Sequence, residues 1–174
     1  MYVRQLFQFI FLFILQVFIL NRICLLEVVT PMIYIVFIFS LPFSTPKWLV
    51  VLLGFCCGFL MDTFSGVLGF HALATLIIAF LRAATIRIIS QRTEREEHLL
   101  PIFHDMKFGW YLRYVFCLTF IHQFVYYFTD VLSFHNFGKL MLVVSANTLG
   151  SLLCIFLIQI LVYKQSKRYQ FFKL

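Results

Sequence analysis

The 174-residue chain is 63% hydrophobic and only 12% charged, and 24 of its residues are phenylalanine. Soluble globular domains carry roughly a quarter charged residues, so this composition excludes an ordinary water-soluble domain. The formal net charge of +7 does not by itself indicate a nucleic-acid partner, because basic residues form such a site only where they cluster on an exposed surface. We therefore predict an all-α, polytopic integral membrane protein that contacts membrane lipids and no nucleic acid.

Six apolar stretches follow one another along the chain, each close to the roughly 20 residues that a membrane-spanning helix needs. The first begins after Arg4 like a signal peptide, but no small-residue cleavage site follows, so we interpret it as a retained anchor. Pro31 and Pro42 bracket the second stretch and are expected to shorten or kink it. The predicted spans are about 5–20, 28–44, 48–63, 67–88, 108–131 and 139–163.

The distribution of lysine and arginine predicts the orientation, because cytoplasmic loops are enriched in both. With six spans the two termini share one side, and that side collects most basic residues, whereas the other has only Arg22 and Lys139. We predict a single transmembrane domain over 1–174 with both termini cytoplasmic, a cytoplasmic loop over 89–107 and a basic cytoplasmic tail over 164–174. The basic residues on the predicted cytoplasmic side are Arg4, Lys47, Arg82, Arg87, Arg92, Arg95, Lys107, Arg113, Lys164, Lys167, Arg168 and Lys173.

The connection over 89–107 is the one long loop that this segmentation leaves. It mixes both charge signs and contains Pro101, so we interpret it as a helical extension of the fourth span followed by a surface segment. Its function is open between a solvated loop and a docking site for a cytoplasmic partner.

The stretch GFCCGFLMDTFSGVLGFHALATL over 54–76 places one carboxylate among four glycines. Gly54, Gly58, Asp62 and Gly66 are spaced by four, so on a helix they share one face. Small residues at this spacing form a groove that lets another helix approach closely, and we predict that the helix of a partner or of a neighbouring protomer docks there. Asp62 is expected in the outer half of the membrane, where a carboxylate costs up to about 2.5 to 3.5 kcal/mol and needs a partner or a wet cavity.

His71 re-enters the membrane on the next span at a depth comparable to that of Asp62. One prediction is a contact between Asp62 and His71, direct or through water. The alternative is that Asp62 caps the following turn while His71 donates to a backbone carbonyl. Ser65 would complete a Ser/His/Asp set, but the sequence has neither a nucleophile elbow nor an oxyanion element, so no catalytic residue is predicted.

Neither a metal ion nor another cofactor is predicted. His71, His122 and Asp62 lack the i, i+4 spacing of helical metal ligands. All five cysteines lie inside apolar runs without a Cys-x-x-Cys spacing, which favours small buried side chains over metal ligands or disulfides.

Other polar residues are sparse in the predicted spans, and we expect them to form hydrogen bonds between helices rather than a ligand site. Asp130 is expected close to the outer surface, as an ordinary residue at a helix end. The remaining members of this set are Gln16, His122, Gln123, Tyr126, Tyr127, Ser145, Asn147, Thr148, Ser151 and Gln159.

The arrangement of Gly58, Asp62, Gly66, Gly69 and His71 resembles the central motif of the MreD family, the small polytopic subunit of the bacterial rod-shape (elongation) complex. Chain length, an apolar N-terminal anchor, both termini inside and a basic tail are also similar. The resemblance implies a six-helix fold like that of the substrate-binding subunits of energy-coupling-factor vitamin transporters, in the bacterial cytoplasmic (inner) membrane. The partners that it implies are an MreC-like protein, an MreB-like actin-family filament, RodA and a class B penicillin-binding protein.

Two functions from different classes are predicted. The first is a non-enzymatic scaffold that docks partner transmembrane helices and, as the resemblance implies, supports lateral peptidoglycan synthesis and cell shape. The alternative is the substrate-binding subunit of a small-molecule, vitamin-type transporter, motivated by the same six-helix outline and the buried acid. Such a subunit needs polar side chains spread over several spans and outer loops, and the outer loops here carry few. A membrane-embedded enzyme is disfavoured, because the acids and histidines have no ligand-like spacing.

Overall fold

The computed structural model describes residues 2–22, 29–67, 69–90, 101–102, 106–131 and 136–171. Within these ranges every long regular element is a helix, which confirms the all-α part of the predicted fold class. The helices are α1 (Tyr2–Phe18), a short 3-10 helix η1 (Leu20–Arg22), α2 (Val36–Phe39), α3 (Lys47–Ser65), α4 (Phe70–Ile89), α5 (Phe108–Val131) and α6 (Phe137–Phe171).

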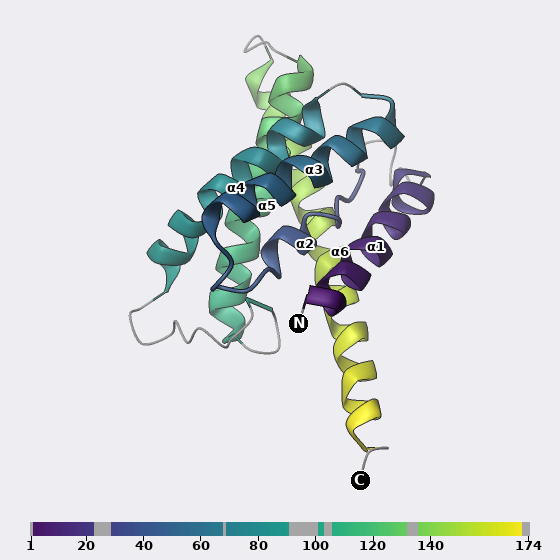
Figure 1. Ribbon diagram of the computed structural model, residues 1–174. Coiled ribbons are helices and arrows are strands. Elements are labelled where there is room, and N and C mark those ends of the chain that lie inside the picture. The colour runs from purple at the N-terminus through teal and green to yellow at the C-terminus, as the bar shows by residue number, and fades with distance from the viewer. Residues whose placement is uncertain are drawn as a thin grey trace.

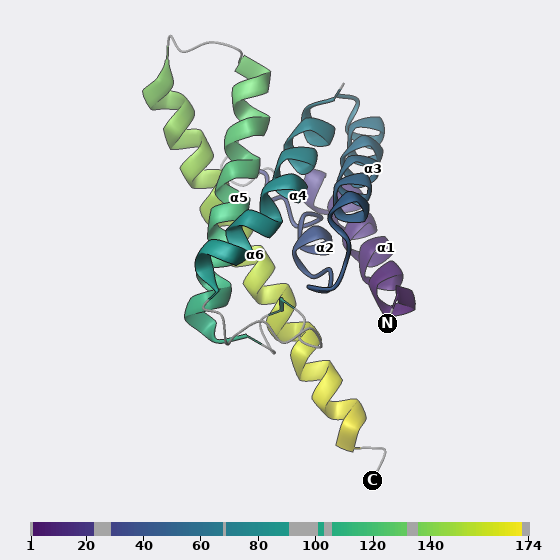
Figure 2. The same cartoon turned by 60° about the vertical axis from the view of Figure 1, so that its left-hand side comes forward.

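The long helices form two antiparallel hairpins, α3 with α4 and α5 with α6, and α4 packs against α5 to join them (Figures 1 and 2). The N-terminal helix α1 lies on the α3 side, and the short α2 sits between α1 and the two hairpins (Figure 2). In both views α1 begins and α6 ends at the lower end of the bundle. The start of α1 and the end of α6 therefore lie on the same side of the bundle, while the number of membrane crossings and the cytoplasmic location of the termini stay predictions.

In the described part of the chain, three helical segments are long and apolar enough to cross a membrane, which is compatible with a membrane protein: α3, α4 and Phe137–Ile160 of α6. The apolar part of α1, Gln5–Phe18, is shorter. Helix α5 has 24 residues, but its sequence includes His122, Gln123 and several tyrosines, which make it less apolar. The structure thus supports the six predicted spans only in part.

The predicted second span over 28–44 is wrong as a continuous helix. Residues 30–33 are not helical, and α2 contains only Val36–Phe39. Nevertheless, every residue from Pro31 to Pro42 is buried. Irregular backbone at membrane depth is tolerated only where protein covers it, and here the surrounding helices provide that cover. We call residues 29–42 the broken segment.

Side chains from distant helices satisfy the backbone groups that the broken segment leaves unpaired. From α1, Gln16 donates to the Pro31 carbonyl at 3.0 Å and accepts from the Ile33 N–H at 2.7 Å. From α6, Ser151 Oγ accepts from the Met32 N–H at 2.9 Å. The Thr30 N–H donates to Asn147 Oδ1 at 2.8 Å. Because an unpaired backbone group in an apolar interior is costly, these bonds hold the segment in its non-helical form.

The lower end of the broken segment is held by a buried arginine. Arg82 of α4 is only 4% exposed, and its guanidinium donates to the carbonyls of Leu41 and Pro42 and, through Nε, to the Tyr114 hydroxyl at 3.1 Å. Tyr114 in turn donates to the Phe39 carbonyl at 3.2 Å. Arg82 therefore stabilises the end of the broken segment through buried hydrogen bonds.

Two further boundaries differ from the prediction. Helix α4 ends at Ile89, with Ser90 in an extended conformation, so it does not continue unbroken into the loop over 89–107 as expected. Most of that loop, residues 91–100 and 103–105, lies outside the described residues. Helix α6 continues to Phe171, beyond the predicted end at residue 163, so much of the predicted tail is helical.

Candidate functional site

Asp62 lies where α3 ends, and its backbone carbonyl terminates that helix. The carbonyl accepts hydrogen bonds from the N–H groups of Gly66 and, at 3.2 Å, Val67. Gly66 has a φ of 69°, the left-handed conformation that glycine adopts without a Cβ penalty. Gly66 thus serves as the helix stop, and its place four residues after Asp62 reflects this cap rather than a continuing groove.

The Asp62 carboxylate begins the next helix. Oδ1 accepts from the His71 N–H and Oδ2 from the Ala72 N–H, both at 2.9 Å. These N–H groups belong to the first turn of α4, where no intrahelical acceptor is available, and the N-cap residue Gly69 has no side chain to bond them. A carboxylate at this position also interacts favourably with the helix dipole. Asp62 is therefore a capping residue supplied by the preceding helix.

The remaining glycines of the motif bring α3 into close contact with α4. A Cβ at Gly58 would collide with the Thr75 hydroxyl, lie 2.5 Å from the His71 carbonyl oxygen and 2.6 Å from Ala72 Cα. A Cβ at Gly54 would lie 2.6 Å from the Ala79 side chain. At these distances only glycine fits, so the two helix backbones touch at both positions. We call Gly54, Gly58, Asp62, Gly66, Gly69 and His71 the hairpin motif.

This packing corrects the prediction that the glycine groove receives a partner's helix. The groove exists, but α4 of the same chain fills it, and Gly54, Gly58 and Asp62 are all buried. The sequence pattern of small residues four apart identifies a close helix contact, and cannot distinguish a contact within the chain from one between chains. Any docking of a partner must use a different face.

The side chain of His71 belongs to a chain of three buried rings. Its Nδ1 lies 3.0 Å from the hydroxyl of Tyr34, and that hydroxyl lies 2.8 Å from Nε2 of His122. The three residues are 5%, 1% and 0% exposed. The hydroxyl has one proton, so it donates to one imidazole and accepts an N–H from the other. Because Tyr34 comes from the broken segment, His71 from α4 and His122 from α5, these bonds tie the segment to both hairpins.

The outcome for the predicted pair of Asp62 and His71 is mixed. Asp62 and His71 are in direct contact, but through the carboxylate and the His71 N–H. The carboxylate caps the start of α4 and not the turn that directly follows Asp62, so the expected cap of that turn is not confirmed. The His71 ring bonds Tyr34, neither Asp62 nor a backbone carbonyl. Ser65 Oγ accepts from Asn21 Nδ2 at 3.3 Å, and the described hydrogen bonds do not connect it to His71 or Asp62.

Most other polar residues that the sequence indicated are also used within the chain. Gln123 Nε2 donates to Ser151 Oγ at 2.9 Å, a bond between α5 and α6 as predicted. Gln16 and Asn147, expected to link helices, instead bond the broken segment. Thr148 bonds a carbonyl of its own helix. Asp130 is exposed near the end of α5, as expected.

Tyr34 and the structural role of Arg82 were missed by the sequence analysis. The signal that was available is the pair of prolines around the second stretch, since a proline-bracketed apolar segment leaves backbone groups that other side chains must bond. Of the cysteines in the described part, Cys57 is buried, Cys154 is half-buried, and Cys56 and Cys117 are exposed. No group of three His, Cys, Asp or Glu side chains that could hold a metal ion occurs among the residues described.

Comparison with known proteins finds no relative of this chain. No family model matches it, and neither a curated protein nor a solved structure is significantly similar. The likeness to the MreD motif therefore rests on the hairpin motif itself.

Proposed function

We propose that this chain is a non-enzymatic membrane subunit of a rod-shape (elongation) complex, which acts by assembling partner proteins in the bacterial inner membrane. The observation that carries the proposal is the use of the hairpin motif. The residues that resemble the MreD motif hold α3 and α4 together as a hairpin, so their role is structural rather than reactive. A rigid helix hairpin of this kind is compatible with a protein that acts by binding partner proteins.

The buried polar side chains support the same function. Gln16, Arg82 and Asn147 bond the backbone of the broken segment, and the His71 ring bonds Tyr34 from that segment. A substrate-binding subunit would instead direct such groups into a cavity, where they fix a ligand. These side chains bond the backbone of the broken segment, which leaves the outer faces of the helices for partners. The expected partners are an MreC-like protein, an MreB-like filament, RodA and a class B penicillin-binding protein.

The test is photocrosslinking in native membranes from single exposed positions on different helices. We would place the crosslinker at Phe59 of α3, Phe80 of α4 and Leu153 of α6, which are 57%, 72% and 67% exposed. Cys57, at 1% exposure, is the matched buried control. Capture of an MreC-like protein or RodA from an exposed position, absent at Cys57, together with cell rounding when the chain is depleted, would support the proposal.

Two outcomes would overturn it. One is that depleted cells keep their rod shape and their lateral peptidoglycan synthesis. The other is that no elongation protein is captured while the purified chain retains a small molecule, which would favour the transporter alternative.

A further inference from the structure

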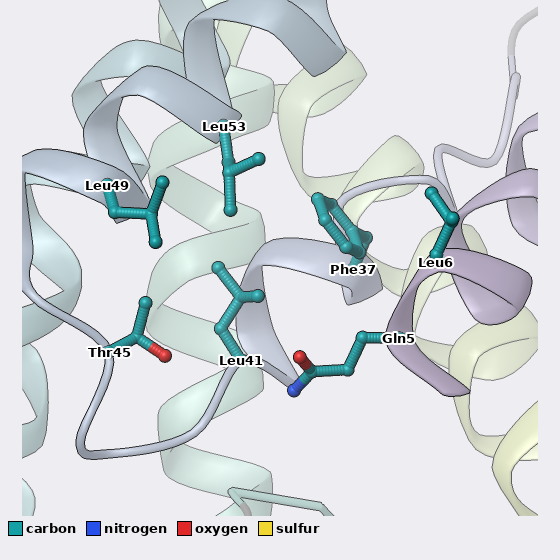
Figure 3. Close-up of a pocket in the computed structure, with 7 residues that line it drawn as sticks. All are labelled: Gln5, Leu6, Phe37, Leu41, Thr45, Leu49 and Leu53. Carbon is teal, nitrogen blue, oxygen red and sulfur yellow. The ribbon is translucent and has the colours of Figure 1, made fainter. Parts of the chain in front are cut away.

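A groove of about 340 Å³ opens between α1, α2 and α3, away from the hairpin motif (Figure 3). Its size lies at the lower end of the roughly 300 to 1,000 Å³ typical of small-molecule sites. Leucine and phenylalanine side chains form most of its wall, and two polar side chains are the exceptions. The lining residues are Gln5 and Leu6 of α1, Phe37 of α2, Leu41 and Thr45 of the following connection, and Leu49 and Leu53 of α3.

Gln5 is the unusual member of this wall. Its side chain is 6% exposed, yet its Nε2 has no hydrogen-bond partner in the described part of the chain. Figure 3 shows its amide at the end of the groove beside Leu41, on the same side as the Thr45 hydroxyl. A buried amide donor without an acceptor is unfavourable, so the groove lacks an acceptor that its occupant would supply.

The polar end of the groove lies at the expected level of the lipid headgroups. Gln5 belongs to the first turns of α1, which begins at the lower end of the bundle (Figure 2), and Thr45 lies two residues before α3. Lys47 is exposed, and Trp48 is 68% exposed. Tryptophan is enriched at membrane interfaces, and lysine extends its ammonium group toward the phosphates. The apolar wall formed by Phe37, Leu49 and Leu53 continues from there toward the membrane interior.

We infer that this groove binds one anionic glycerophospholipid. An ester carbonyl accepts from the Gln5 amide beside the Thr45 hydroxyl, the phosphate lies near Lys47, and one acyl chain follows the apolar wall. The inference does not depend on the proposed function.

The geometry favours a lipid over a partner's helix as the occupant. The backbone carbonyls of a helix are already bonded within it, so they are poor acceptors for Gln5, whereas ester carbonyls have no donor of their own. A helix with side chains is about 10 Å wide, much wider than a single acyl chain. An acyl chain is narrow enough to enter.

The test uses phosphatidylglycerol with a photoreactive acyl chain, in vesicles of phosphatidylethanolamine and phosphatidylglycerol that contain the full chain. Labelled peptides are mapped by mass spectrometry. Leu53→Trp fills the groove, and Leu52→Trp is its control, because Leu52 is 50% exposed and does not line the groove. Gln5→Leu removes the amide at similar volume, with Gln8→Leu, outside the groove, as its control.

We expect labelling to concentrate on α1 and on residues 37–53. It should be lost in Leu53→Trp and fall about fivefold in Gln5→Leu, the value of one lost hydrogen bond, while both controls label like the unmodified chain. Labelling spread evenly over all exposed helices, equal in variants and controls, would reduce the site to ordinary surrounding lipid and overturn the inference.

Discussion

The α3–α4 hairpin and the broken segment are both apolar, yet the chain stabilises them in opposite ways. In the hairpin the backbone bonds itself, and the Asp62 side chain caps the start of α4, where the first N–H groups have no acceptor within the helix. In the broken segment the backbone cannot bond itself, and side chains from α1, α4 and α6 complete it. A regular element thus depends on local fit, whereas an irregular buried element depends on residues far away in the sequence.

The largest effect is expected from Gly58→Ala, which would break the hairpin. The new Cβ would meet the backbone at His71 and Ala72, and backbone atoms cannot rotate away as a flexible side chain does. We expect destabilisation of about 3 kcal/mol, at the upper end of overpacking effects, measured by thermal unfolding in detergent. Gly109→Ala is the control, because nothing lies within 4 Å of a Cβ there. Equal stability of the two variants would contradict the close contact.

Asp62→Ala should cost less, because it removes a cap and leaves the helix contact in place. Two N–H groups of α4 lose their acceptor, and we expect a loss of about 2 kcal/mol, with Asp62→Asn losing about half as much because its amide oxygen replaces one acceptor. Hydrogen exchange should accelerate at His71 and Ala72 while the middle of α4 stays protected. Asp130→Asn, at an exposed site, is the control. Acceleration along all of α4 would contradict a purely terminal role.

The smallest loss of stability is expected from Ser151→Ala. This variant tests whether the broken segment depends on distant residues, because its effect should appear far from the mutation. Ser151 accepts from the Met32 N–H, 119 residues away, and from Gln123. Its loss should cost about 1 kcal/mol and accelerate hydrogen exchange at Met32, with α6 itself unchanged. Ser145→Ala, on an exposed position of the same helix, is the control. Faster exchange confined to α6 would contradict the proposed support of the broken segment.

The regular helices were largely predictable from the sequence. The span predicted over 108–131 matches α5, and those over 48–63 and 67–88 match α3 and α4 within about three residues. Hydropathy succeeds here because a long apolar stretch that must bury its backbone has the helix as its simplest solution. It failed over 28–44, because hydropathy reports burial and not backbone conformation. Pro31 and Pro42 gave the only warning.

The hairpin motif could be predicted in part. The four-residue spacing identified a close helix contact at Gly54 and Gly58, and Asp62 was weighed as a cap. The identity of the approaching helix was not predictable, because small residues allow the close approach of any helix, from the same chain or from another. The hydrogen bonds that join Tyr34, His71 and His122 could not be predicted, because His71 and His122 lie 37 and 88 residues from Tyr34 in the sequence.

The sequence by itself determined that the chain is apolar and helical, where most helices begin and end, and that Gly58 needs a near neighbour. These properties depend on local composition and spacing, which fix burial and backbone hydrogen bonding within one element. Only the tertiary structure decided that α4 fills the glycine groove and that Gln16, Arg82 and Ser151 complete a non-helical segment. Those contacts depend on which elements meet in space, and a backbone group without a local partner can be bonded by any helix that the fold brings within reach.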